Sequence, residues 1–126
     1  MFKAGGTNTS VTETIAKVCA EFGVNPVEGV LSHKMKKHLI DGNDVIINKE
    51  SPDQRVEEYE FMPGDIFGLD IFVSTGEGKP KEGEFRTTVY KREIDTQYNL
   101  KSKSARSFFA EVNKKYPTLP FSIRSF

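Results

Sequence analysis

The N-terminal part of the chain contains a helical repeat of apolar positions. Five apolar side chains recur at spacings of three and four residues and so share one helix face: Val11, Ile15, Val18, Cys19 and Phe22. Ser10 begins a capping box with the glutamate at 13, and Gly23 suits a left-handed stop. The pattern predicts a helix over 11–22, with Cys19 packed in the core rather than exposed as a reactive thiol.

A second helical repeat lies near the C-terminal end of the sequence. Its apolar positions again follow spacings of three and four: Ala105, Phe108, Phe109, Val112 and Tyr116. Either Ser102 or Ser104 can cap the first turn, and Pro117 ends the repeat. We therefore expect a second helix between these caps and this proline.

Extended segments occupy much of the chain between the two helices. Residues 44–47 form a short strand candidate, and 62–65 (Met-Pro-Gly-Asp) read as a turn. Residues 66–73 are almost continuously apolar, which is typical of a strand covered on both faces. Residues 85–91 alternate between two faces, and 120–126 alternate weakly. The order of helix, strands and helix predicts an α+β fold with a mostly antiparallel sheet.

Length and composition narrow the class of protein. The 126 residues are enough for a single domain over 1–126. The longest apolar runs are too short for a membrane-spanning helix, which needs about 18 residues. Cys19 is the only cysteine, so no internal disulfide forms. No secretory leader pattern opens the sequence, and we expect a soluble intracellular protein.

Charge is distributed unevenly along a neutral chain. Residues 1–63 contain 7 basic and 10 acidic side chains, whereas 64–126 contain 11 and 8. Residues 86–126 carry 9 basic and 3 acidic side chains, a net charge of +6. A smaller basic patch lies at Lys34, Lys36 and Lys37. Such a basic segment can be a solvated face, or it can neutralise the phosphates of a nucleic acid. The candidate phosphate contacts are Lys91, Arg92, Lys101, Lys103, Arg106, Lys114 and Lys115.

Candidate metal ligands are few. His33 and His38 are five residues apart, so they do not share a helix face, and on a strand they point to opposite sides. Asp70 interrupts an apolar run, where a carboxylate is costly unless it is paired or bound to a cation. Asp70 is therefore either a metal ligand, or the remnant of one, or a residue on the exposed side of its strand.

Several longer motifs resemble one family, the proliferation-associated proteins, also called ErbB-receptor-binding proteins. The resemblance covers essentially the whole chain. The matching stretches are 26–33, 36–42, 73–79, 86–92, 97–101 and 120–126. It implies the "pita-bread" fold of type II methionine aminopeptidases. It also implies that the chain is a central fragment of a protein about three times longer, with the type II helical insert at 91–119.

The resemblance also bears on the metal-binding positions of the aminopeptidases. Their histidine ligand corresponds to Ser32 or His33, depending on the register, and their glutamate ligand corresponds to Asp70. A second active-site histidine of the enzymes is replaced in the segment 40–42 (Ile-Asp-Gly). Aspartate is shorter than glutamate by one methylene, and metal–oxygen bonds tolerate only small changes in length. The resemblance therefore implies degenerate ligand positions, no metal or other cofactor, and no catalysis.

A function follows from the resemblance as an expectation. It implies a non-catalytic protein that binds rRNA, the ribosome or other structured RNA, and that regulates growth, ribosome biogenesis and translation in the cytoplasm, nucleus and nucleolus. One alternative is a protein-interaction scaffold for a receptor tail or for transcriptional regulators. A minor alternative is an active type II methionine aminopeptidase. The open sheet edges of a partial fold also predict self-association.

Overall fold

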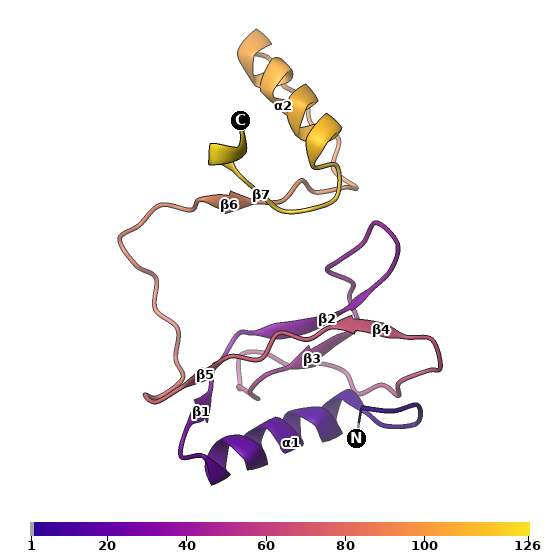
Figure 1. Ribbon diagram of the computed structural model, residues 1–126, viewed down its shortest axis with the longest axis vertical. Coiled ribbons are helices and arrows are strands. Elements are labelled where there is room, and N and C mark those ends of the chain that lie inside the picture. The colour runs from indigo at the N-terminus through magenta and orange to yellow at the C-terminus, as the bar shows by residue number, and fades with distance from the viewer. Residues whose placement is uncertain (1) are drawn as a thin grey trace. The chain divides into compact units, whose positions relative to one another are not determined.

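Helix α1, Asn8–Glu21, confirms the first predicted helix but begins three residues earlier (Figure 1). Thr7 is the N-cap, and its Oγ1 accepts the Ser10 N–H at 3.3 Å. Ser10 therefore lies inside the helix, so the predicted capping box is wrong: the hydroxyl of Ser10 donates to the Thr7 carbonyl instead. Gly23 follows the helix at φ +65°, a left-handed conformation that glycine adopts without strain. The structure is a computed structural model that describes residues 2–126, and Met1 lies outside them.

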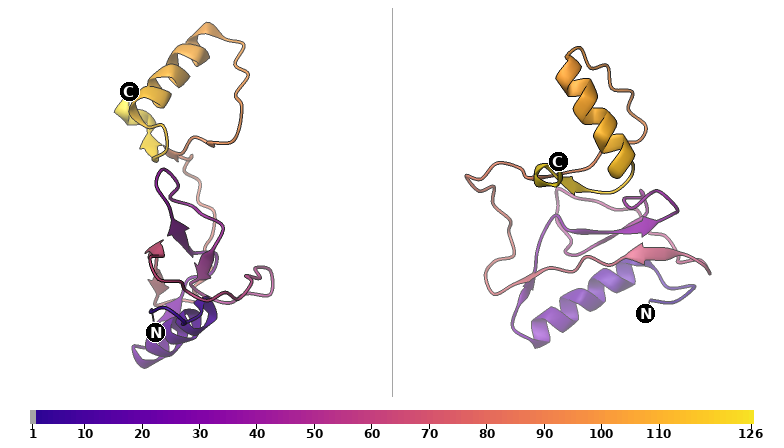
Figure 2. Two further views of the ribbon diagram at one scale, coloured as in Figure 1. Left: turned by 90° about the vertical axis from the view of Figure 1, so that its right-hand side faces the viewer. Right: turned by 45° about the horizontal axis from the view of Figure 1, so that its top comes forward.

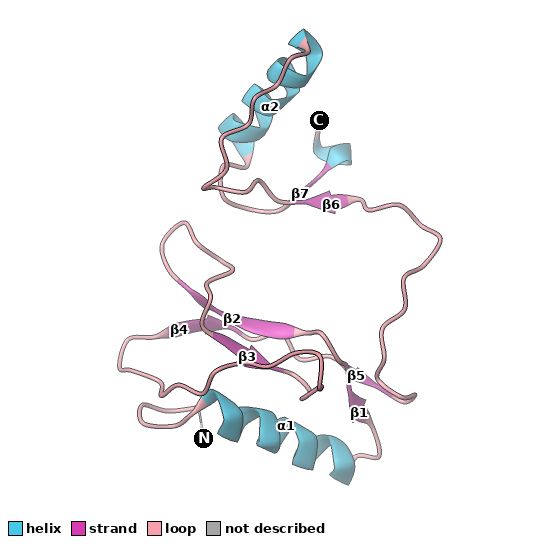
Figure 3. Cartoon of the chain, turned by 180° about the vertical axis from the view of Figure 1, so that it is seen from behind, coloured by secondary structure: helices cyan, strands magenta, loops and turns pink. Residues whose placement is uncertain are grey.

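Strands β2 (Leu31–Met35), β3 (Val45–Ile47) and β4 (Ile66–Gly68) form a three-stranded antiparallel sheet in the order β3-β2-β4. The predicted strand over 44–47 is confirmed as β3, whose three side chains are all buried. Helix α1 runs along this sheet, as Figures 1 and 3 show. Two side chains join them: Asn8 donates to the Val45 carbonyl at 3.3 Å, and Thr12 donates to the Ile47 carbonyl at 2.6 Å.

The core of this part of the chain has an apolar and an aromatic component. Cys19 is only 5% exposed, which confirms its predicted core position. Phe2, Tyr59, Phe61 and Phe67 form an aromatic cluster with ring centroids 4.8–6.4 Å apart. These rings come from three segments of the chain, so their contacts join the segment before α1 to β4.

The apolar run 66–73 differs from its prediction. It forms two short strands, β4 and β5 (Val73–Ser74), and β5 pairs with β1 (Asn25–Pro26) rather than with the larger sheet. Its side chains are not buried on both faces, since Leu69 is 56% and Ile71 is 49% exposed. The prediction of a doubly covered strand is wrong for the described residues, because none of them packs over the outer side of this segment.

Contacts divide the chain into two compact units, one ending at Glu82 and the other running from Gly83 to Phe126. In the second unit, β6 (Val89–Tyr90) pairs with β7 (Phe121–Ser122). The predicted strand over 85–91 thus shrinks to two residues, because its two-residue partner offers no more pairing. A short 3-10 helix, Ile123–Ser125, follows β7, so the predicted extended segment over 120–126 is confirmed only at its start.

Helix α2, Lys103–Lys115, confirms the second predicted helix. Ser102 caps it by accepting the Ala105 N–H at 3.4 Å, and Val112 is its most buried residue at 2% exposure. The C-terminal turn lies beside α2 (Figure 2), where Phe108 and Phe126 contact at 4.9 Å between ring centroids. All strand pairs are antiparallel, as predicted. Among residues 2–126, no helix has the length and apolar character that a bilayer crossing requires.

Candidate functional site

Two of the predicted ligand positions, Ser32 and Asp70, lie side by side; His33, the alternative to Ser32, is the next residue of β2. The Asp70 N–H donates to Ser32 Oγ at 2.8 Å, and the Ser32 hydroxyl lies 3.4 Å from the Asp70 carbonyl. Ser32 is 3% exposed, whereas the side chain of Asp70 is exposed. The hydroxyl is therefore used to hold the backbone of Asp70, and the carboxylate takes no part in this contact.

His33 points away from Ser32, since neighbouring residues of a strand face opposite sides of the sheet. Its Nδ1 lies 2.9 Å from the Gly42 carbonyl, and its backbone pairs with Val45 and Gly68. His38 lies in the hairpin turn that follows β2, at φ +67°. Within the described chain, no three side chains of the His, Cys, Asp or Glu type gather closely enough to hold a metal ion.

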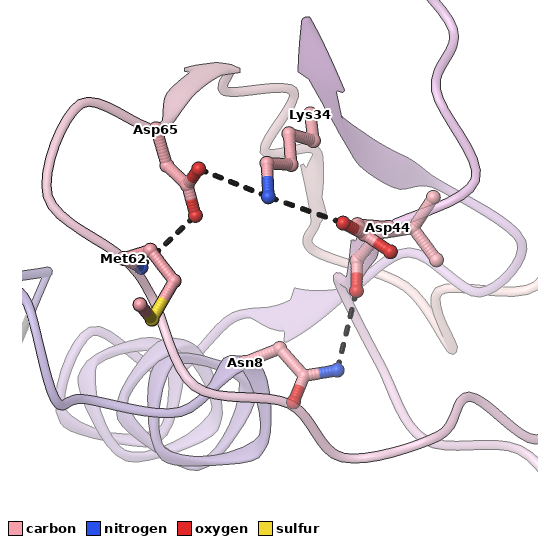
Figure 4. Close-up of polar contacts among 6 residues, drawn as sticks. Asn8, Lys34, Asp44, Met62 and Asp65 are labelled. Atoms are coloured by element: carbon pink, nitrogen blue, oxygen red, sulfur yellow. Dashed lines mark hydrogen bonds and ion pairs between the residues drawn. The ribbon is translucent and has the colours of Figure 1, made fainter.

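An ion-pair cluster that the sequence reasoning missed surrounds Lys34 (Figure 4). The Lys34 ammonium lies 2.9 Å from Asp65 and 3.2 Å from Asp44. The Met62 N–H donates to the Asp65 carboxylate at 3.0 Å. This hydrogen bond is the largest cause of a lowered pKa of Asp65, and the hydrogen bond from Lys34 is the next. Asp65 and Asp44 in turn raise the pKa of Lys34. The two carboxylates therefore compensate the positive charge of Lys34. The predicted basic patch of Lys34, Lys36 and Lys37 is reduced to Lys36 and Lys37.

Tyr59 lies near this cluster and in the aromatic core. Its hydroxyl is buried and has no hydrogen-bond partner among the described residues. Burial raises the pKa of Tyr59 to about 12, and the charges of Asp44 and Asp65 add to the effect. Neither feature has a local sequence signal, because both depend on residues brought together by the sheet.

The seven predicted basic residues of the second unit fall into two groups. Four are engaged within the protein: Lys91, Arg92, Arg106 and Lys115. Arg92 donates to the Pro117 carbonyl at 3.4 Å and lies 5.9 Å from the ring centroid of Phe109. Arg106 donates to two backbone carbonyls, those of Leu100 at 3.1 Å and Lys101 at 2.7 Å. Lys115 lies 5.1 Å from the ring centroid of Phe126 and 3.9 Å from Glu111.

The other group consists of exposed lysines whose ammonium groups make no ion pair within residues 2–126: Lys101, Lys103 and Lys114. Lys103 and Lys114 are eleven residues apart, which is three helical turns plus about 20°. They therefore lie on one side of α2, about 16 Å apart, opposite the buried Val112. The only acidic residue of α2 is Glu111, which faces Lys115. This side of α2 can attract an anion extended over more than one phosphate.

Comparisons with known proteins show which proteins this chain is similar to. The chain is 47% identical over 125 residues to ErbB-3 binding protein 1 of Solanum tuberosum, covering 98% of this chain and 32% of that protein. It is 43% identical over 126 residues to proliferation-associated protein A of Dictyostelium discoideum, covering 100% and 33%. It is 38% identical over 126 residues to a curved DNA-binding protein of Schizosaccharomyces pombe, covering 98% of this chain and 33% of that protein. No family model matches the chain.

A solved structure of a thermophilic Arx1 superposes on the chain with a TM-score of 0.80 and 31% identity, covering 94% of this chain and 32% of that one. Methionine aminopeptidases are among the more distant relatives. The chain therefore has a pita-bread-like, methionine aminopeptidase-like fold, as predicted.

Within that class, the chain is a homologue of the proliferation-associated and ErbB-3-binding proteins, which confirms the resemblance seen in its motifs. The chain spans about a third of the length of the curated relatives that it matches.

Proposed function

We propose that this chain serves as part of a non-catalytic, aminopeptidase-like protein that binds structured RNA, such as rRNA in the ribosome. The observation that carries the proposal is the side of α2 with the unpaired cations Lys103 and Lys114, together with Lys101 just before the helix. Cations without internal partners can replace the counterions of a phosphate backbone and position the protein without reading bases. The name of the fission yeast relative, a curved DNA-binding protein, supports affinity for a nucleic acid.

The ligand positions support the absence of catalysis. Ser32 uses its hydroxyl to bind the backbone of Asp70, and an aspartate stands where the enzymes have a glutamate. Regulation of growth, ribosome biogenesis and translation, and residence in the cytoplasm, nucleus and nucleolus, follow as parts of the same proposal. The segment 91–119, which includes Lys91, is the proposed helical insert that presents the basic surface.

The experiment compares two triple variants of matched charge in a salt series with labelled rRNA. One changes Lys101, Lys103 and Lys114 to Gln, and the other changes three exposed lysines of the first unit, Lys17, Lys37 and Lys81. We expect the first variant to lower the slope of log affinity against log salt by up to about 2.7, as about 0.9 is lost per phosphate contact. The second variant should retain most of the slope. Equal effects of the two variants would contradict the proposal.

Metal binding tests the non-catalytic part separately. Isothermal titration of the full-length protein, of which this chain is a part, with Mn²⁺ or Co²⁺ should give no stoichiometric heat, because Asp70 and the position at Ser32 or His33 depart from the ligands of the enzymes. Tight binding of two ions per chain, with release of methionine from a Met-Ala-Ser peptide, would favour an active aminopeptidase instead.

A protein-interaction scaffold is the second candidate, and the names of the ErbB-3-binding relatives favour it. It predicts that partners, such as a receptor tail or a transcriptional regulator, are captured equally well before and after nuclease treatment. Loss of these partners after nuclease treatment would assign them to the RNA.

A further inference from the structure

Arg106 differs from the lysines around it in what its side chain contacts. Its Nη1 donates to the carbonyls of Leu100 and Lys101 at 3.1 and 2.7 Å. Nη1 carries only two hydrogens, so both are used inside the protein. Arg106 lies in the second turn of α2, and the two carbonyls belong to the segment just before the N-cap. The guanidinium therefore attaches this incoming segment to the helix.

Lys101 depends on that attachment. It is exposed, it precedes the N-cap Ser102 by one residue, and the structure gives its ammonium no contact among the described residues. What holds Lys101 in place is its own carbonyl, which accepts from Arg106. A cation that is already ordered loses less entropy on binding a phosphate than one on a loose segment.

We propose that Arg106 is a positioning residue of the RNA-binding surface: it holds the backbone of residues 100–101 so that Lys101 meets a phosphate next to the one that Lys103 binds. The inference rests on the proposed function, because it assigns a role within that surface. The partner is the phosphate backbone of an RNA duplex, because α2 presents these lysines on the side away from its aromatic residues. Phe108 and Phe109 lie toward the opposite side, where they contact Phe126 and Tyr98. Single-strand binding would need such rings beside the cations as stacking platforms.

The test is a double-mutant cycle on the full chain, with a labelled RNA duplex somewhat longer than roughly 16 base pairs as the probe. R106Q and K101Q should each lower the salt slope by about 0.9, the contribution of one phosphate contact. The double variant R106Q/K101Q should lower it by the same single step, because Arg106 acts through Lys101. If Arg106 itself neutralises a phosphate, the two steps add to about 1.8, and the inference is overturned.

A matched cycle controls for general damage to α2. Lys114 lies at the other end of the helix and has no contact with the segment before it, so the effects of R106Q and K114Q should add. Coupling of Arg106 to Lys114 as strong as to Lys101 would mean that R106Q unfolds the helix, and would overturn the assignment.

A second readout needs no RNA. Backbone NMR order parameters at residues 100 and 101 should fall in R106Q and stay unchanged in K101Q, because the Arg106 side chain holds the carbonyls of these two residues. Unchanged order parameters in R106Q overturn the inference even if RNA binding is weakened. A wild-type chain with an ordered backbone at 100–101 but no salt-dependent binding to the duplex would instead remove the RNA site, and with it the role of Arg106 there.

Discussion

The Lys34 ammonium pairs with two carboxylates, those of Asp44 and Asp65. The pairing with Asp65 makes the stability of the fold depend on pH. Asp65 is bonded by both the Met62 N–H and Lys34, and the pKa of Asp65 is lowered as a result. A lowered pKa in the folded state stabilises the fold at pH values above the ordinary aspartate value, and this contribution is lost as the pH falls through the lowered value.

Asp65→Asn should therefore remove part of the acid sensitivity of the first unit. We expect the free energy of unfolding of the wild type to fall as the pH drops below about 4, and that of Asp65→Asn to fall less over this range. Urea unfolding at a series of pH values measures it. Asp53→Asn is the control, because Asp53 makes no ion pair within the described chain. Parallel pH curves for wild type and Asp65→Asn would contradict the expectation.

Tyr59 places a hydroxyl in the core without a partner. Tyr59→Phe should leave the free energy of unfolding at pH 7 unchanged or raise it by up to about 1 kcal/mol, since an unsatisfied polar group is removed. The wild type should lose stability between pH 10 and the raised pKa of Tyr59 at about 12, because the unfolded tyrosine ionises first. The variant should lack this loss up to the pH at which Lys34 begins to deprotonate. Destabilisation by Tyr59→Phe at pH 7 would reveal a hydrogen bond to this hydroxyl.

At the scale of elements, α1 and α2 are held by different forces. Helix α1 is joined to β3 by Asn8 and Thr12 and buries Cys19. Helix α2 buries fully only Val112 and is capped by Ser102, whose hydroxyl also bonds that of Ser104 at 2.7 Å. With so little burial, we expect the cap to contribute a larger share of the stability of α2 than Thr7 contributes to α1.

Ser102→Ala tests this expectation. Loss of the cap should cost about 1 kcal/mol and lower the helical circular dichroism signal of the chain. Ser107→Ala is the matched control: Ser107 is exposed within α2, and alanine has the higher helix propensity, so this variant should be neutral or slightly stabilising. The same loss in both variants would show that the cap is not what stabilises the first turn.

At the scale of the whole molecule, the stretch between the two units carries no regular secondary structure from residue 75 to 88 and is largely exposed, with Phe85 97% exposed. Exposed segments of this kind are preferred sites of proteolysis. We expect limited trypsin digestion to cut first after Lys81 and Arg86, as measured by mass spectrometry. Lys17 on α1 is the internal control and should be cut much later. Cleavage after Lys81 and Arg86 that is no earlier than cleavage after Lys17 would contradict the expectation.

The apolar repeats predicted the helices well and the strands less well. Helix contacts link residues three or four apart, so the stripes ending at Phe22 and Tyr116 were sufficient to locate α1 and α2. The start of α1 was missed because Thr7, and not Ser10, provides the cap. The run over 66–73 was assigned burial on two sides because its composition is apolar, but exposure depends on which segments cover it, which composition does not record.

The candidate site divides in the same way. The sequence could name Asp70 and the position at Ser32 or His33 through the family resemblance, and the lysines at 101, 103 and 114 through charge. The sequence could not show which cations pair within the protein. Arg92 bonds a backbone carbonyl and Lys34 pairs with carboxylates, and folding alone brings these groups together. The sequence by itself determined the two helices, the α+β class and the basic character of the last third, because these depend on local spacing and on charge; the pita-bread fold came from the resemblance of its motifs to a known family. Only the tertiary structure decided that Ser32 binds the backbone of Asp70, that Lys34 is neutralised and that Arg106 is anchored before α2. Each of these depends on groups brought within hydrogen-bond distance by chain pairing and loop geometry, which no local pattern encodes.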